Sequence, residues 1–254
     1  MIRLENFSIG FKERQLLEEV SLSFKSPGLT ALLGRNGSGK STLLRSLCRL
    51  NESYRGQIFI NDLNLKKIPR LNLAREISYV NTCRPRIANL KSWDIVALGR
   101  SPYSGWSGYL TATDRQIIES ALEEVGMSEY KIRSVDTLSD GEFQKIMIAR
   151  ALAQNTDIMI LDEPTSFLDL PTRYELVMLL KNLVSLKKKT IIFSTHELDI
   201  ALELADYIAL IDNNQLINLT VSDMVKTGNI QKLFKTPGKY IDRLINVITD
   251  KKYQ

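Results

Sequence analysis

Residues 34–41 read GRNGSGKS, and Gly34, Gly39, Lys40 and Ser41 occupy the fixed positions of the phosphate-binding pattern G-x-x-x-x-G-K-[ST]. Apolar residues just before and just after this segment predict a buried strand and a helix. A strand, a glycine-rich loop and a helix in this order place backbone N–H groups at the positive end of a helix dipole, where a polyphosphate is stabilised. Lys40 would then contact the β- and γ-phosphates, and the Ser41 hydroxyl would ligate Mg²⁺. The segment predicts a nucleoside triphosphate site.

Two carboxylates follow a second apolar strand, because residues 157–161 lead directly into Asp162 and Glu163. In open α/β sheets, ligands bind beyond the carboxyl ends of the strands. Asp162 would therefore face the Mg²⁺ held by Ser41, since a hard cation that bridges phosphates needs few carboxylates and several waters. Glu163 could activate or orient a water. Taken alone, the pair is more typical of a turn with solvated acids; after a phosphate-loop strand it favours the metal site.

His196 is the only histidine of the chain and follows the apolar run 190–194. A histidine in this place is often no more than the first residue of a helix. At the edge of a sheet that also carries the phosphate loop, it could hydrogen-bond the γ-phosphate and hold a water in line.

The segment 138–142 reads LSDGE and opens a predicted helix over 142–153. Ser139, with Glu142 three residues later, matches the capping-box pattern, which is a purely structural explanation. Either way, the helix start offers free N–H groups to an anion.

The order of predicted elements indicates one α/β core. Strands at 77–80, 157–161 and 190–194 alternate with helices, as in a mostly parallel sheet with helices on both faces. From about 85 to 137 the apolar spacing is helical, with a Gly/Ser/aromatic loop at 99–110. This stretch predicts a helical lobe inserted into the core.

Composition excludes several classes of protein. Hydrophobic residues make up 44% of the 254 residues and charged residues 25%, and no apolar stretch is long enough for a membrane helix. Two cysteines and no secretory signal are typical of a reducing compartment, so we expect the cytoplasm. The net charge is +5, and the sequence has one cluster of basic residues, at 187–189. It precedes an apolar run and reads as a solvated helix end, so we expect no nucleic-acid partner.

The five motifs together, in the order phosphate loop, 138–142, 160–163, 168–169 and 194–196, resemble the ATP-binding subunits of ABC transporters over about residues 1–215. Segment 138–142 corresponds to the family signature. The resemblance implies a P-loop NTPase core with a mostly parallel sheet, an N-terminal antiparallel β subdomain and an inserted α-helical lobe. It also implies a homodimer in which two subunits pack head to tail around two ATP molecules.

The resemblance assigns residues to each ATP. One subunit would supply the catalytic residues Lys40, Glu163 and His196, with Ser41, Asp162 and Thr82 at Mg²⁺. The second subunit would supply Ser139, Gly141 and Asp169. Phe11 matches the aromatic that stacks on adenine, although a core position explains it as well. The remaining phosphate-loop contacts would come from Gly34, Asn36, Gly37, Ser38, Gly39 and Thr42.

Two positions depart from the family pattern. The first signature glycine is replaced by Asp140, and Thr82 stands where a glutamine usually contacts Mg²⁺ and the attacking water. Thr82 still offers an oxygen, with a shorter reach. We expect metal binding through Ser41 and Asp162 to survive, whereas coupling and the hydrolysis rate are open.

Residues 96–100, followed by Pro102, Tyr103 and the helix predicted over 114–125, resemble importers of iron chelates, haem or cobalamin. The implied partners are integral membrane permease subunits and a separate substrate-binding protein, with this chain peripheral on the cytoplasmic face of the inner membrane. Four aromatics would receive a helix of the permease, because Trp and Tyr anchor interfaces; alternatively, some of them pack inside the lobe. They are Trp93, Tyr103, Trp106 and Tyr109.

We expect an ATPase that drives a permease, in an ATP-binding domain over 1–220, with a short helical extension over 221–254. One alternative is a soluble ABC-type ATPase that acts on nucleic acid or ribosomes. Such proteins carry long heptad coiled coils or two fused ATPase units, and neither is present in this sequence. A P-loop binding module without hydrolysis is the other alternative, which Thr82 keeps open.

Overall fold

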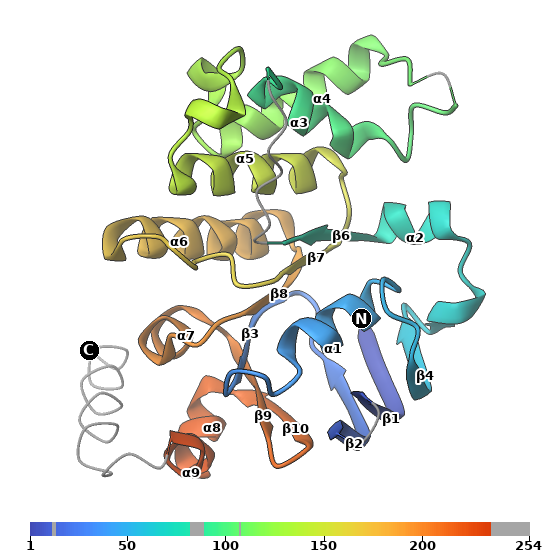
Figure 1. Ribbon diagram of the computed structural model, residues 1–254, viewed down its shortest axis with the longest axis vertical. Coiled ribbons are helices and arrows are strands. Elements are labelled where there is room, and N and C mark those ends of the chain that lie inside the picture. Colours follow the sequence, from blue (N-terminus) through green and yellow to red (C-terminus); the bar gives the residue numbers. More distant parts are fainter. Residues whose placement is uncertain (12–13, 82–88, 107, 235–254) are drawn as a thin grey trace. The chain divides into compact units, whose positions relative to one another are not determined.

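The computed structural model describes residues 1–11, 14–81, 89–106 and 108–234. Thr82 and the amphipathic part of the predicted C-terminal extension lie outside these residues. The chain divides into two compact units, one made of 1–67 and 180–254 and the other of 68–179 (Figure 1). Below they are called the nucleotide unit and the helical unit.

The nucleotide unit begins with an antiparallel sheet in the order β2-β1-β4-β5. Ile2, Leu4, Phe7 and Ile9 of β1 are buried, and the alternation shifts by one residue at the irregularity between Leu4 and Phe7. This pattern is expected for a sheet with one face on the core. The sheet confirms the predicted antiparallel β subdomain. Its strands are β1 (Ile2–Phe11), β2 (Arg14–Phe24), β4 (Tyr54–Ile60) and β5 (Leu63–Asn64).

The second sheet of this unit is built around β3 (Gly28–Gly34), which pairs in parallel with β8 (Thr190–Ser194) on one side and β9 (Tyr207–Asp212) on the other. Every residue of β3 is buried, which explains why its sequence is apolar apart from Thr30. β10 (Gln215–Thr220) pairs antiparallel with β9. The helices are α1 (Lys40–Leu47), α7 (Leu198–Leu204), α8 (Val221–Lys226) and α9 (Asn229–Phe234).

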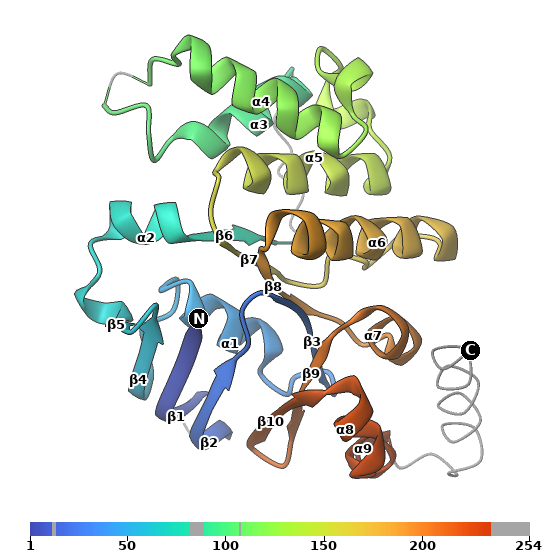
Figure 2. The same cartoon turned by 180° about the vertical axis from the view of Figure 1, so that it is seen from behind.

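The helical unit contains a parallel pair of strands, β6 (Ile77–Val80) and β7 (Ile158–Leu161). Between them in sequence lie α3 (Ser92–Ala97), α4 (Ala112–Glu124) and α5 (Asp140–Ala153), which lie side by side in both views (Figures 1 and 2). The unit begins with α2 (Arg70–Glu76). It also contains the first part of α6 (Leu170–Lys187), whose residues from Leu180 onward belong to the nucleotide unit.

Local signals explain where the lobe helices begin. Thr111 caps α4, because its side chain accepts from the Asp114 N–H at 3.1 Å. The α4 stripe Ile118, Ala121 and Leu122 is buried, as its apolar spacing predicts. The inserted helical lobe is thereby confirmed.

The sequence analysis missed two features, α2 and the hairpin β9–β10. The hairpin turn is Asn213-Asn214, with both residues at positive φ (46° and 62°), the conformation of a type I′ turn that Asn tolerates. No helix in the part of the chain that the structure describes could span a membrane. The domain boundary at 220 stays a prediction, and α8 and α9 lie just beyond it.

Candidate functional site

The phosphate loop joins β3 to α1 in a conformation that requires its glycines. Gly37 and Gly39 have φ values of +74° and +106°, in the left-handed region that glycine adopts freely. A Cβ on Gly34 would lie 2.6 Å from Ser38 Oγ. Gly39 is the N-cap of α1 and supplies no side-chain cap, so the helix start depends on another acceptor.

The surroundings of Lys40 and Ser38 indicate which acceptor completes the start of α1. Lys40 is 5% exposed, and its Nζ donates to the carbonyl oxygens of Gly34 at 3.0 Å and Arg35 at 3.5 Å. Ser38 Oγ is buried and has no hydrogen-bond partner within the described residues. A buried hydroxyl without a partner is costly. A phosphate oxygen would satisfy it and meet the Lys40 charge, so the loop fits a polyphosphate.

A cleft of about 420 Å³ opens beside this loop and is called here the P-loop cleft. Arg14, at the start of β2, lines it and donates from Nη2 to the Gly37 carbonyl at 3.0 Å. Phe11 is the cross-strand partner of Arg14 and is 58% exposed. Phe11 is therefore no core residue, and its ring is free to stack on a base.

His196 lies at the same sheet edge as the phosphate loop. β8 and β3 are parallel, with Ser194 opposite Leu32, and the Thr195 N–H donates to the Leu32 carbonyl at 3.1 Å. His196 is exposed. This position fits contact with the end of a phosphate chain that begins on the loop.

In the helical unit, Asp162 and Glu163 follow β7 at the edge where β6 also ends. The Asp162 N–H donates to the Val80 carbonyl at 2.8 Å, and Asp162 Oδ2 accepts from Tyr79 Oη at 3.3 Å. Glu163 has a φ of +47°, and its Oε2 accepts from Ser166 Oγ at 3.1 Å. Both carboxylates are held in place by neighbours.

The start of α5 is the predicted capping box. Ser139 Oγ accepts from the Glu142 N–H at 3.2 Å, and Glu142 Oε2 accepts from the Ser139 N–H at 2.7 Å. That backbone bond is the main reason why the pKa of Glu142 lies below its usual value. Asp140, in the first turn, is exposed.

A cleft of about 490 Å³ lies at this helix start and is called here the signature cleft. Ser139, Gly141 and Asp169 line it together. The hydroxyl of Thr172, followed by its N–H, lowers the pKa of Asp169, so this carboxylate is anionic at neutral pH. Three residues assigned to one role by resemblance are thus neighbours in the structure.

The predicted site residues form two groups, one in each unit. Phe11, the phosphate loop through Thr42, and His196 lie in the nucleotide unit. Asp162, Glu163 and the signature-cleft residues lie in the helical unit. The sequence analysis passed over Arg14, Ser166 and Phe167. No sequence pattern marked them: Arg14 is the cross-strand partner of Phe11, and Ser166 and Phe167 lie in the loop that follows Glu163.

Three comparisons with known proteins agree with this geometry. The family model for ABC transporters matches residues 17–166. The iron(3+)-hydroxamate import ATP-binding protein FhuC of Bacillus subtilis is 33% identical over 228 residues, which are 90% of this chain and 85% of that protein.

Two solved structures are similar over most of their length. An inward-facing metal-chelate type ABC transporter has a subunit with a TM-score of 0.82 and 26% identity, covering 93% of this chain and 89% of that one. The dimeric bacterial ABC transporter cassette MJ0796 has a TM-score of 0.73 and 25% identity, covering 87% and 99%. These matches confirm the predicted P-loop NTPase fold. The chain belongs to the ABC transporter family and is one of its ATP-binding, ATP-hydrolysing subunits.

Proposed function

We propose that this subunit powers the import of an iron chelate through a membrane permease, by hydrolysing ATP held between two copies of the chain. The observation that carries the proposal is the division of the site residues. The phosphate-binding loop with its buried, unpartnered Ser38 hydroxyl forms one group, and the signature cleft forms another that has no such loop. A chain that carries two complementary parts of a nucleotide site can complete that site with a second copy packed head to tail.

The chemistry follows from the side chains of each group. The phosphate loop and Lys40 hold the β- and γ-phosphates and balance their charge, which is most of what phosphoryl transfer requires. Ser41 and Asp162 offer the hard oxygen ligands that suit Mg²⁺, which supplies further charge neutralisation when bound. Glu163, held by Ser166, takes a proton from the attacking water or orients it. His196 donates to the γ-phosphate.

The cargo and partners are inferred from relatives. FhuC of Bacillus subtilis is named for iron(3+)-hydroxamate import, and the similar solved transporter is of the metal-chelate type. The described residues contain no membrane-spanning helix, so the translocation path would belong to separate permease subunits. A separate substrate-binding protein would deliver the chelate, and this subunit would sit on the cytoplasmic face of the membrane.

The proposed role of Glu163 is tested by Glu163→Gln. The amide keeps the size of the side chain and its bond to Ser166, but it cannot accept a proton. We expect ATP hydrolysis to fall about 10²- to 10⁴-fold, the usual contribution of a positioned base. The affinity for ATP should stay within about threefold, because the phosphates are held by the nucleotide unit.

Glu129→Gln is the matched control, since Glu129 is an exposed carboxylate on the same unit. Phosphate release and nucleotide binding are measured on both variants. Hydrolysis by Glu163→Gln at the wild-type rate contradicts the mechanism. Transport is tested separately, by iron-chelate uptake with the permease co-expressed; recovery of the subunit with ribosomal RNA and no membrane subunit would favour the nucleic-acid alternative.

A further inference from the structure

Tyr79 lies in β6, beside the strand that ends directly before Asp162. The two strands are parallel, with Tyr79 opposite Ile160, and the Asp162 N–H donates to the Val80 carbonyl at 2.8 Å. Because side chains alternate between the faces of a strand, Asp162 lies on the same face as Ile160 and Tyr79. The long Tyr79 side chain leans along this face, and its Oη donates to Asp162 Oδ2 at 3.3 Å. The contact therefore follows from the register of the two strands.

The backbone of β6 is fixed around Tyr79. Arg150 of α5 donates from Nη2 to the Tyr79 carbonyl at 2.6 Å. On the other face of the strand, the buried Ser78 hydroxyl accepts from Thr156 Oγ1 at 3.0 Å. The Tyr79 ring therefore extends towards Asp162 from a point that is held by two other elements of the same unit.

The phenol suits the carboxylate that it contacts. Asp162 is 6% exposed, and a buried carboxylate is tolerated only where its oxygens are hydrogen-bonded. Rotation about the bond to a carboxylate is soft, so the direction of its lone pairs depends on its hydrogen-bond partners. A hydroxyl that donates is uncharged, so Tyr79 orients the carboxylate and leaves its negative charge available to a cation. A buried carboxylate held in this way fits a hard divalent cation.

We propose that Tyr79 is a positioning residue for Mg²⁺ at the ATP site, where it orients the Asp162 carboxylate towards the cation without being a ligand itself. This inference rests on the proposed function, in which Ser41 and Asp162 hold the metal. Hydrogen-bond partners of metal ligands typically contribute about 10- to 100-fold to metal affinity. Loss of the Tyr79 hydroxyl should weaken the metal and spare the phosphate contacts of Lys40, which lies in the nucleotide unit.

The test is Tyr79→Phe, which removes the hydroxyl and keeps the ring. Mn²⁺ is the probe, because it takes the same oxygen ligands as Mg²⁺ and has an electron paramagnetic resonance signal. Free Mn²⁺ is titrated against the subunit in complex with adenylyl imidodiphosphate, an ATP analogue that resists hydrolysis. We expect the dissociation constant of Mn²⁺ to rise about tenfold in Tyr79→Phe. The affinity for the analogue in EDTA should stay within about twofold of wild type.

Tyr103→Phe is the matched control. It makes the same chemical change in the same unit, where the Tyr103 hydroxyl donates to the Gln154 carbonyl at 3.1 Å, and it should leave the Mn²⁺ affinity unchanged. Melting temperatures of both variants measure what each hydroxyl contributes to stability. In an Asp162→Asn background, Tyr79→Phe should have no further effect on Mn²⁺, since the carboxylate that it orients is absent.

Three outcomes overturn the inference. If Tyr79→Phe binds Mn²⁺ as wild type does, Tyr79 does not position the metal ligand, and the proposed function stands. If Tyr79→Phe lowers the melting temperature but changes the Mn²⁺ affinity no more than Tyr103→Phe does, its role is structural only. If wild type and Asp162→Asn bind Mn²⁺ equally, both this inference and the proposed metal site are wrong.

Discussion

At the scale of single residues, Gly141 sets how closely the start of α5 approaches α6. A Cβ on Gly141 would lie 2.7 Å from Thr172 Cγ2, in the first turn of α6. That methyl belongs to a β-branched side chain with little freedom to turn away. The same Thr172 donates its N–H to Asp169 Oδ1 at 3.2 Å, so a displaced Thr172 also disturbs the signature cleft.

We expect Gly141→Ala to lower the free energy of unfolding by about 1–2 kcal/mol, because overpacking costs more than the better helix propensity of Ala returns. Hydrolysis should fall as well. Thr172→Ser removes the clashing methyl and keeps the hydroxyl. The double variant should therefore recover wild-type stability and activity, measured by urea unfolding and phosphate release. A double variant as unstable as Gly141→Ala would show that the contact does not limit this position.

What the sequence predicted at this scale depended on how local the interaction was. The Ser139 capping box was visible because its two residues are three positions apart on one helix. The bond from Arg14 to Gly37 joins a hairpin to a loop, and no local pattern encodes it. Phe167 looked like ordinary loop sequence, since its left-handed backbone angle, a φ of +67°, follows from bonds made by its neighbours.

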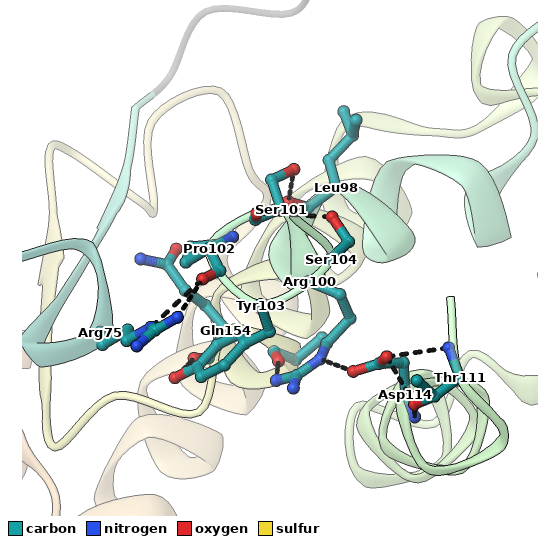
Figure 3. A network of polar contacts seen from close by, with 11 residues as sticks. Arg75, Leu98, Arg100, Ser101, Pro102, Tyr103, Ser104, Thr111, Asp114 and Gln154 are labelled. Carbon is teal, nitrogen blue, oxygen red and sulfur yellow. Dashed lines mark hydrogen bonds and ion pairs between the residues drawn. The ribbon is translucent and has the colours of Figure 1, made fainter. Parts of the chain in front are cut away.

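At the scale of elements, the lobe is held together by a buried polar network around Arg100 (Figure 3). Arg100 Nε donates to Asp114 Oδ1 at 2.8 Å, and Nη1 donates to the Ala153 carbonyl at 2.7 Å. The Tyr103 ring lies over the guanidinium, with its centroid 4.0 Å from Arg100 Cζ. The Tyr103 hydroxyl donates to the Gln154 carbonyl at 3.1 Å. One arginine thus joins the start of α4 to the end of α5.

Because Arg100 and Asp114 are both buried, we expect Asp114→Asn to cost about 3 kcal/mol in the free energy of unfolding, by leaving a buried cation without its counter-charge. Adding Arg100→Met removes that cation, so the double variant should be more stable than Asp114→Asn alone. Urea unfolding of wild type, Asp114→Asn, Arg100→Met and the double variant measures the coupling energy between Arg100 and Asp114. Additive losses would mean that the pair does not interact energetically.

The buried Asp114 carboxylate also makes the free energy of unfolding depend on pH. The Thr111 hydroxyl, and then Arg100, lower the pKa of Asp114 from 3.8 to about 2. A carboxylate whose pKa is lowered by folding stabilises the protein fully above its unfolded pKa, and the contribution is lost as pH falls from about 4 towards 2. The stability gap between wild type and Asp114→Asn should therefore be smaller at about pH 3 than at about pH 5. A constant gap would contradict the assignment.

Helices and strands were predicted correctly where their apolar pattern extends over many residues. The apolar stripe of α4 and the mostly apolar run of β3 both indicate the structure that forms. α2 spans only Arg70–Glu76 and buries Leu73 alone, too little to give a period. The hairpin β9–β10 depends on its Asn-Asn turn, a weaker signal than the usual Asn-Gly.

At the scale of the whole molecule, the four aromatics of the lobe divide between interior and surface. Tyr103 packs on Arg100 inside the lobe, so for this residue the packing alternative is confirmed. Trp93 is half-buried, and its Nε1 donates to Glu119 at 3.2 Å. Trp106 and Tyr109 are 104% and 73% exposed, so neither contributes to the core of the lobe.

Trp106 and Tyr109 are therefore the residues on which permease binding is tested. We expect Trp106→Ser with Tyr109→Ser to leave the melting temperature of the isolated subunit unchanged and its ATPase activity within about twofold of wild type, because both side chains are exposed and neither is a predicted site residue. Recovery of the subunit with its co-expressed permease should fall at least about tenfold, since exposed Trp and Tyr are common interface anchors. Leu186→Ser is the control, because Leu186 is 81% exposed on the other unit. Unchanged permease recovery, with the control also unchanged, would place the permease contact elsewhere on this subunit.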